Sequence, residues 1–482
     1  RWDEISHWGP MVKEILRLDK FYSVAESALS VHKDYPPAVS LFQSIWCKLS
    51  GGYKEAYLYT SLQILSLSLF FPSLSKFNWG KSRNNIVKLV LLVIVILSST
   101  VVIPVKASFY QSIYIDCFLG LLLAYSLYLA VMEKRITKLG LFRLSVALTV
   151  LLLTKQMGLV FYGIVIIAFV VNQSILHKHD LKNIINRHPK KKVIGSALGI
   201  ILCLIIIPTI FMMSWNLNVS VNNIPRQFTI SDINLFKLVG IAAGQSGEAY
   251  QHTTLVNYAK TILREPFLDR PLSLYYWQLM ILFAVAFYAV GKYGRKYFEK
   301  YQFSGLNFVI ILGSIIYAFS LLLLYVFAFG SYEGPNLASY YRYLNTYWFA
   351  VFNLAMMFFL YITGYKENDR IKASTNTLVF VFAALWLVFF QPFTLNNFIP
   401  RLSYYSVTND YKDDANIITN NTEETDKIYV IAQHDNGTIK FYLQYLTLPR
   451  NINKGHYSLG EPYDKHDIFT KNISEEQWYS RL

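Results

Sequence analysis

Long apolar runs separated by short polar segments dominate the hydrophobic pattern of the chain. A helix needs about 20 mainly apolar residues to cross the hydrocarbon core of a bilayer. Apolar runs predict membrane-spanning segments near residues 55–73, 85–104, 108–131, 142–154, 156–172, 194–213, 275–291, 305–328, 342–363 and 375–391. The pattern therefore predicts an all-α polytopic membrane protein.

Two neighbouring apolar runs, 142–154 and 156–172, are shorter than a full crossing. They meet at Thr154, Lys155 and Gln156, and we expect them to form a broken or re-entrant helix pair. Non-helical backbone at membrane depth persists only where protein or a cavity buries it. The junction is therefore expected to be covered by other parts of the fold.

Composition agrees with a bilayer protein. The chain has 482 residues, of which 54% are hydrophobic and 16% are charged, whereas soluble proteins carry about 25% charged residues. A net charge of +15 would favour nucleic-acid binding in a soluble protein. Here the basic residues cluster in short loops between apolar runs, so we expect no nucleic-acid partner. The three cysteines indicate neither a disulfide framework nor a metal site.

Basic residues in the short loops predict the orientation, because cytoplasmic loops are enriched in lysine and arginine. Five loops alternate correctly if all of them are cytoplasmic. Their basic residues include Lys76, Lys81, Arg83, Lys134, Arg135, Lys138, Arg143, Lys178, Lys182, Arg187, Lys190, Lys191, Lys192, Lys292, Arg295, Lys296, Lys300, Lys366, Arg370 and Lys372. Both ends of the chain are then expected on the outer side of the cell membrane.

This orientation divides the chain into three parts. Residues 1–54 are expected to form a first outer loop with interfacial helices, and residues 55–391 a transmembrane helical domain with a long outer loop at 214–274. Residues 392–482 are expected to form an outer C-terminal segment. Because the chain starts at Arg1 without a methionine and stops within polar sequence, we expect a fragment with at least one membrane helix upstream.

The C-terminal segment has the pattern of a small α/β unit. Residues 427–431 form a short apolar run typical of a buried strand, and residues 437–446 have the pattern of a short helix.

Acidic residues stand at two places on the expected outer face. Asp3 and Glu4 lie between aromatic residues near the start of the chain, although acids also favour a solvated helix N-terminus. Asp116 lies at the outer end of a strongly apolar run. An ionisable residue there is costly and marks a site or a cavity, unless it reaches the interface.

Two basic residues accompany them. Lys155 separates the two short apolar runs, and Arg342 opens a later span. Both residue types bind phosphate, lysine as a point charge and arginine through two parallel hydrogen bonds. Both can also anchor a helix at the interface. A reaction on a lipid-phosphate sugar needs a base for the acceptor proton and cations for the departing phosphate.

The order of these motifs resembles the GT-C superfamily of membrane glycosyltransferases and is similar to family 39, which contains protein mannosyltransferases and aminoarabinose transferases. The resemblance covers residues 1 to about 390. The matching motifs are Asp3-Glu4, Pro36-Pro37, Asp116, Thr154-Lys155-Gln156 and Arg342-Tyr343-Leu344.

The chain departs from the family pattern at two motifs. The late motif lacks the proline that follows it in relatives, and Tyr35 stands where aminoarabinose transferases have a lysine, with Lys33 the nearest basic residue. The tail around residues 433–437 resembles the outer domains of Gram-positive bacterial members.

The resemblance implies a GT-C-like helical bundle. It also implies an inverting transfer of sugar from a polyprenyl-phosphate donor to a hydroxyl of an envelope polymer, glycolipid or protein. Asp3 would be the base, while Glu4 or Asp116 would orient the acceptor. Asp3 and Asp116 are the candidate ligands if a divalent cation, Mg²⁺ or Mn²⁺, takes part. The candidate substrate-binding residues are His7, Lys33, Tyr35, Lys155 and Arg342.

Two other functions stay open. A transporter or flippase of lipid-linked sugars also needs basic residues and a lipid groove, but the sequence has neither the internal repeats nor the midplane charges frequent in transporters. A polysaccharide polymerase or ligase is also a glycosyltransferase, and only the order of the motifs in this chain argues against it.

Overall fold

A computed structural model describes most of the chain. The described residues are 2–76, 112–133, 136–178, 190–227, 234–267, 273–294, 297–299, 301–366, 409–426, 428–452, 458–462, 470 and 474–480. The predicted spans at 85–104 and 375–391 lie outside these residues.

Within the described ranges, five helical segments are long and apolar enough to cross a membrane, which supports a bilayer environment. They are α5 (Ile115–Met132), α7 (Gly158–Leu176), Val193–Val221, α14 (Gln302–Phe327) and residues Tyr340–Ile362 of α15 (Tyr340–Lys366). The Val193–Val221 segment combines α9 (Lys190–Ile201), the π-helix η4 (Leu202–Ile206) and α10 (Ile207–Val221). A shorter apolar helix, α13 (Tyr276–Tyr293), packs beside α14. The sequence predicted an apolar helix in each of these regions.

The predicted span at 55–73 is interrupted. Helix α3 (Glu55–Ser68) ends before a 3₁₀ turn, η2 (Phe71–Leu74). Pro72 has no backbone N–H to continue a helix, and its carbonyl oxygen accepts a hydrogen bond from Tyr128 Oη at 3.5 Å. This hydrogen bond links the 3₁₀ turn to the second half of α5. Helix α3 itself is not among the five long apolar helices.

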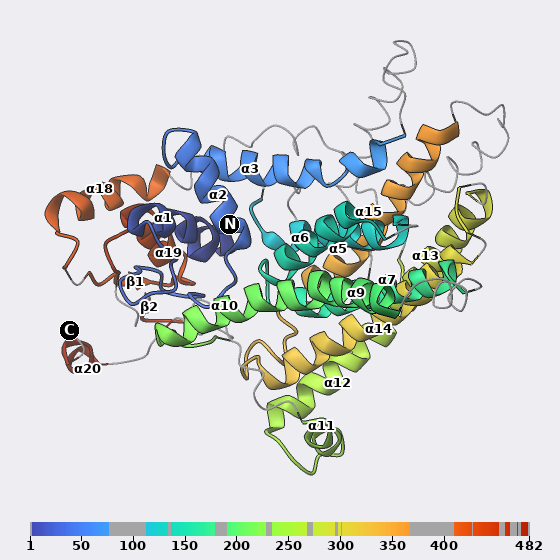
Figure 1. Ribbon diagram of the computed structural model, residues 1–482. Coiled ribbons are helices and arrows are strands. Elements are labelled where there is room, and N and C mark those ends of the chain that lie inside the picture. The colour runs from blue at the N-terminus through green and yellow to red at the C-terminus, as the bar shows by residue number, and fades with distance from the viewer. Residues whose placement is uncertain are drawn as a thin grey trace.

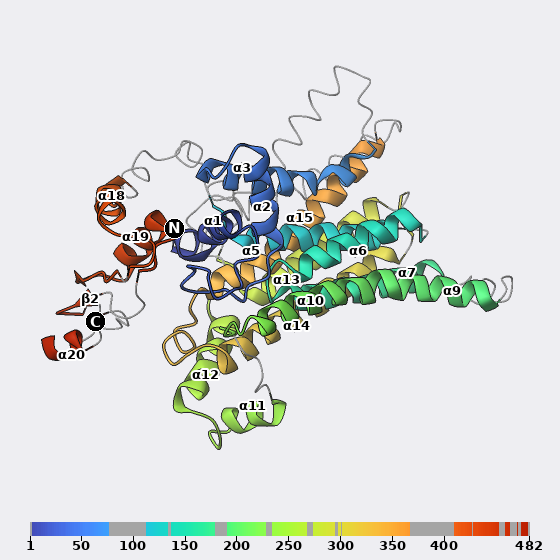
Figure 2. The same cartoon turned by 60° about the vertical axis from the view of Figure 1, so that its left-hand side comes forward.

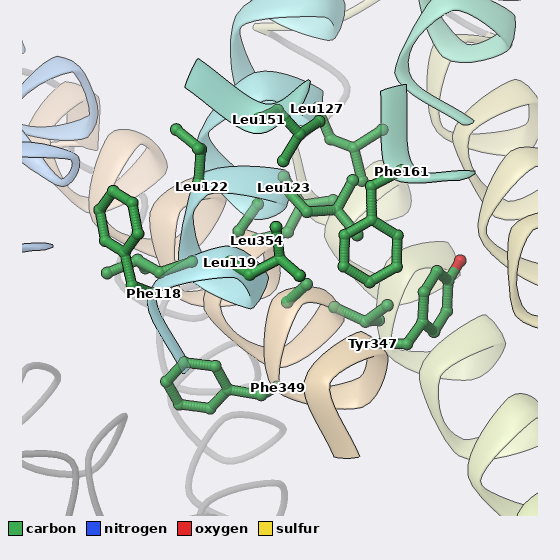
Figure 3. Close-up of a cluster of buried hydrophobic side chains, with 14 of the residues drawn as sticks. Phe118, Leu119, Leu122, Leu123, Leu127, Leu151, Phe161, Tyr347, Phe349 and Leu354 are labelled. Carbon is green, nitrogen blue, oxygen red and sulfur yellow. The ribbon is translucent and has the colours of Figure 1, made fainter. Parts of the chain in front are cut away.

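Helices α5 and α15 form the centre of the bundle. The apolar window of α15 is entirely buried, and that of α5 is 78% buried. A Cβ added at Gly120 would lie 2.6 Å from the carbonyl oxygen of Thr346, so glycine permits the close approach of the two helices, as small residues do in membrane bundles. Figure 3 shows part of this core, with labels on Phe118, Leu119, Leu122, Leu123, Leu127, Leu151, Phe161, Tyr347, Phe349 and Leu354.

The Val193–Val221 segment is the opposite case, because only 11% of its apolar window is buried in the protein. A helix with a mean hydropathy of 2.6 and so little protein cover suits contact with lipid.

Polar side chains join α5, α7 and α14 at one end of the bundle. Asn172 Nδ2 donates to the carbonyl oxygen of Ala130 at 3.0 Å, and Gln302 Nε2 donates to that of Val131 at 2.6 Å. The end of α5, the second half of α7 and the start of α14 therefore meet at one end, which we call the distal end. The start of α5, the start of α7 and the end of α14 meet at the other end, which we call the proximal end.

The region predicted as an outer loop at 214–274 is partly helical. Helix α10 extends to Val221, and α11 (Leu235–Ala242) and α12 (Ala249–Arg264) follow. Helix α12 packs along α14, where Tyr258 Oη donates to the carbonyl oxygen of Ala318 at 2.6 Å.

The first part of the chain forms a π-helix, η1 (Glu4–Trp8), followed by α1 (Gly9–Leu18) and α2 (Ala38–Leu49). Figures 1 and 2 both show the C-terminal elements, coloured orange to red, on the side of the molecule that carries α1 and the N-terminus, with the last helix at the outer edge. These elements are α18 (Lys412–Asn421), β1 (Ala432–Gln433), α19 (Thr438–Thr447), β2 (Ser458–Leu459) and α20 (Glu475–Tyr479), and β1 pairs with β2 in parallel.

The helix predicted at 437–446 is confirmed as α19, but the strand predicted at 427–431 is wrong in its position. Ile428 makes only an isolated bridge with Ile452, and the paired strand begins at Ala432. Ile428 is buried against Leu443 of α19, so helix packing rather than strand pairing explains the burial of Ile428.

Tyr445 of α19 docks the C-terminal segment onto the first part of the chain. Lys13 Nζ donates to the Tyr445 carbonyl oxygen at 2.6 Å and lies 3.8 Å from the centre of its ring. Tyr445 Oη lies 2.6 Å from Tyr53 Oη and donates to Glu55 at 2.8 Å. Helix α19 thus contacts the segment that carries Asp3.

Candidate active site

The helix break predicted near Lys155 is confirmed between α6 (Lys138–Leu152) and α7, whereas α7 is longer than the predicted run and by itself long enough to cross a membrane. Thr154 is fully buried there. A Cβ added at Gly158 would lie 2.0 Å from the carbonyl oxygen of Leu151, so the sharp turn requires glycine. The Leu153 carbonyl oxygen accepts a hydrogen bond from Ala38 N at 2.9 Å. The segment that follows the two prolines therefore covers the break, which presents Lys155.

Four charged side chains from distant segments meet at the proximal end. Asp116 Oδ1 lies 2.5 Å from Lys155 Nζ, and Asp116 Oδ2 lies 3.6 Å from Arg342 Nε. Arg342 Nη1 donates to Asp3 Oδ2 at 2.6 Å. We call Asp3, Arg342, Asp116 and Lys155 the charge cluster. The sequence identified each of these residues as a candidate, and the structure brings the four together.

The charge cluster alternates in sign and has no net charge. Its side chains are between 10% and 22% exposed. Removing such charges from water costs several kcal/mol per ion unless each is paired, and here every charge has a partner of opposite sign. This arrangement lets two cations and two carboxylates persist at the end of an apolar bundle.

Two tyrosines support the cations. The Arg342 guanidinium carbon lies 5.1 Å from the Tyr114 ring centre and 5.0 Å from that of Tyr343, and Lys155 Nζ lies 4.9 Å from the Tyr343 ring centre. These are cation–π distances. The backbone N–H of Asp3 donates to Tyr114 Oη at 3.3 Å. Burial, together with nearby Asp3, raises the pKa of Tyr114 to about 12, so its hydroxyl stays neutral.

A cavity of about 190 Å³ adjoins the charge cluster. Its wall includes Asp116, Lys155, Gln156, Tyr35 and Tyr343. The wall also contains Met157, which precedes α7, and the apolar residues Leu159 and Val160 of α7 and Leu321, Leu323 and Leu324 of α14.

The packing of α7 against α14 explains where this cavity lies. A Cβ added at Gly313 would lie 3.1 Å from Ile164, and one added at Gly305 would lie 3.0 Å from Val171. The two helices are therefore tightly packed towards the distal end. The cavity lies nearer the proximal end, where Leu159 on its wall is 52% exposed.

Glu4 has a different environment from Asp3. It is 7% exposed, and its carboxylate accepts hydrogen bonds from Ile113 N at 2.9 Å and Tyr59 Oη at 3.3 Å. These contacts tie the first segment to the start of α5 and to α3. The geometry favours a positioning role for Glu4 beside the charge cluster.

The other predicted binding residues surround the cluster. His7 is buried, bonds Ser6 Oγ at 2.8 Å and lies with its ring 4.5 Å from that of His32. Burial, with His32 and Lys155 nearby, holds the pKa of His7 well below its usual range. Lys33 Nζ donates to the carbonyl oxygen of Ser27 at 2.7 Å and is not part of the cavity wall.

Sequence reasoning missed three residues of this region. Two of them, Tyr114 and Tyr343, have their rings beside the Arg342 guanidinium. The only feature of the sequence that could have identified them is their closeness in the chain to Asp116 and Arg342. The third is Asp34, which is 5% exposed and accepts a hydrogen bond from Gln156 Nε2 at 3.3 Å. Burial raises the pKa of Asp34.

The residues present do not fit a divalent cation between Asp3 and Asp116. Both carboxylates contact Arg342, so a guanidinium lies where a bridging ion would have to bind. Among the residues that the structure describes, no group of three or more His, Cys, Asp or Glu side chains could hold a metal ion.

No protein-family model, curated protein or solved structure matches this chain.

Proposed function

We propose that the protein is an integral membrane glycosyltransferase. It would transfer a sugar from a polyprenyl-phosphate donor to an acceptor hydroxyl on the outer face of the membrane. The observation that carries this proposal is the position of Lys155, which stands in the charge cluster and in the wall of a cavity with an apolar side. A lipid phosphate needs both environments within a few ångströms.

The cavity suits the two parts of such a donor. The apolar residues of α7 and α14 accept the first units of the lipid chain, and Lys155 accepts the phosphate as a point charge. Arg342 lies one residue from Tyr343 of the cavity wall. It supplies a second cation once the phosphate displaces part of the network.

The reaction follows from the order of charges along the cluster. The acceptor oxygen forms a bond to the anomeric carbon, and the bond from that carbon to the phosphate oxygen breaks. The bonding electron pair stays on the phosphate. Asp3 takes the acceptor proton as its oxygen attacks. A single displacement of this kind inverts the anomeric centre.

During this step Asp3 loses its negative charge while the leaving phosphate gains one. Once Asp3 carries the proton, it no longer attracts Arg342 as an anion. The guanidinium is then free to stabilise the charge that grows on the phosphate, as preorganised cations do in phosphate chemistry. The ion pair at 2.6 Å between Asp3 and Arg342 thus links the base to the leaving group.

The multi-pass topology, the GT-C-like bundle and the outer position of both ends belong to this proposal. The orientation is supported by the predicted cytoplasmic loops, since Lys138 and Lys178 adjoin the distal ends of α6 and α7. The charge cluster then lies on the outer face, where an envelope polymer, a glycolipid or a protein supplies the acceptor.

A transporter of lipid-linked sugars is the second candidate, because a basic residue such as Lys155 in the wall of a mainly apolar cavity also suits a transported lipid phosphate. Lipid profiling of cells that lack the protein separates the two. The enzyme hypothesis predicts accumulation of one polyprenyl-phosphate sugar, which the wild-type gene reverses and an Asp3→Asn variant does not. An unchanged lipid-linked sugar pool would contradict both functions, and full reversal by Asp3→Asn would favour the transporter.

A further inference from the structure

Arg342 occupies the centre of the charge cluster in a fixed pose. Its Nη1 contacts Asp3 at 2.6 Å and its Nε lies 3.6 Å from Asp116. Its guanidinium also lies near the rings of Tyr114 and Tyr343, at 5.1 and 5.0 Å. The side chain is only 17% exposed, so the surrounding residues hold the cation between the two carboxylates.

A divalent ion would have to displace Arg342 to reach Asp3 and Asp116, because the guanidinium contacts both carboxylates. Mg²⁺ takes six oxygen ligands in near-octahedral geometry, and it is usually held by one or two carboxylates, waters and substrate phosphates. Two further carboxylates of this region, Glu4 and Asp34, have hydrogen-bond partners outside the charge cluster. Glu4 accepts hydrogen bonds from Ile113 N and Tyr59 Oη. Asp34 accepts both of its hydrogen bonds, from Gln156 Nε2 and Gln227 N, at Oδ2.

Charge argues in the same direction. The cluster is neutral with its own lysine and arginine, and an added divalent ion would leave two uncompensated positive charges in a poorly solvated place. A sugar phosphodiester carries one negative charge and would compensate only one of them.

We propose that the Arg342 guanidinium does the work of a divalent cation at this site, so that sugar transfer needs no metal ion. The catalytic part of this inference rests on the proposed function, whereas the part about ion binding does not. Arg342 orients Asp3 before the reaction and stabilises the leaving phosphate during it. An ammonium group has no planar fork to bind two partners at once, so lysine replaces arginine only in part.

The first experiment measures ion binding and requires no sugar donor or acceptor. Purified full-length chain in detergent is titrated with Mn²⁺, and free Mn²⁺ is followed by electron paramagnetic resonance. We expect that the wild-type chain binds no Mn²⁺ at the charge cluster with a submillimolar dissociation constant. The Asp116→Asn variant should therefore bind as much Mn²⁺ as the wild type. One such ion per chain, lost in Asp116→Asn, would overturn the inference whatever the protein catalyses.

The second experiment measures transfer with the wild-type chain and four variants. We expect full wild-type transfer in excess EDTA, a loss of about 10²-fold in Arg342→Met, and partial activity in Arg342→Lys. Added guanidinium ion should restore part of the transfer in Arg342→Ala, because that variant leaves the space of the side chain empty. Arg264→Met, on the exposed face of α12, is the matched control and should behave as wild type.

The two hypotheses fail in different ways. Transfer that EDTA abolishes and Mg²⁺ restores would overturn the role of Arg342 and leave the glycosyltransferase standing. Absence of transfer by the wild-type chain from every donor would instead remove the function on which the catalytic part rests.

Discussion

Replacing Lys155 with methionine separates the structural role of its charge from its role in donor binding. Methionine keeps an apolar stem and loses the ammonium group, which lies 2.5 Å from Asp116. Breaking a buried ion pair costs about 3–5 kcal/mol when one charge is left alone. Asp116 keeps Arg342 at 3.6 Å, so we expect a loss of stability near or below the lower end of that range.

Donor binding should weaken by a separate amount. A hydrogen bond to a charged group contributes about 1.5–3 kcal/mol, which corresponds to a 10- to 150-fold increase in the donor KM. Lys155→Arg keeps the charge and should lose less.

The double variant Lys155→Met with Asp116→Asn distinguishes the two effects. It removes one charge of each sign, so the melting temperature should recover towards that of the wild type. The donor KM should stay high, because the phosphate has still lost its cation. Lys260→Met, at an exposed position of α12, controls for the loss of a positive charge. A double variant with normal stability and a wild-type donor KM would refute the assignment of Lys155 to the phosphate.

Four further predictions test other parts of the account. Asp3→Asn should lower transfer about 10²-fold or more at unchanged protein level, and near-normal turnover would exclude Asp3 as the base. In a background without native cysteines, Ser246→Cys should react with an impermeant reagent in intact cells and Lys178→Cys only after lysis; the reverse pattern would invert the topology. Burial lowers the pKa of His32 from 6.5 to about 4. Between these two pH values the His32 imidazole is therefore mainly protonated in the unfolded chain and mainly neutral in the folded chain. Stability should therefore fall by up to about 3 kcal/mol as the pH drops through that window, and His32→Gln should flatten this part of the pH profile measured by thermal denaturation. Tyr445→Ala should expose the C-terminal segment to limited proteolysis, whereas wild-type resistance would show that this contact does not hold it.

The apolar pattern was sufficient to predict most of the helices. A bilayer imposes both the length and the composition of a spanning helix, so runs such as 305–328 and 342–363 correspond closely to α14 and α15. The same pattern predicted the break at Lys155, because the two apolar runs 142–154 and 156–172 meet there. It was less informative at 55–73, where Pro72 lies in an apolar run but ends the regular helix.

The candidate residues could be predicted singly but not as a network. Asp116 and Lys155 stand out because a charge within an apolar stretch is costly without a purpose. The ion pair between Asp3 and Arg342 joins residues 339 positions apart, and no local pattern encodes such a contact. The same limit applies to Glu4, since only the folded chain reveals that Ile113 N donates a hydrogen bond to one of its carboxylate oxygens.

The most direct test of the proposed function is sugar transfer by the purified protein. The full-length chain in detergent is incubated with a panel of polyprenyl-phosphate sugars and a membrane extract that supplies acceptors. The account predicts release of free polyprenyl phosphate from one donor and appearance of its sugar, with inverted anomeric configuration, in the acceptor fraction. It also predicts that Asp3→Asn and Lys155→Met abolish or greatly slow both signals. Intact donor throughout the panel after prolonged incubation, with a wild-type chain that moves the same lipids across a vesicle membrane, would contradict the account in favour of a transporter.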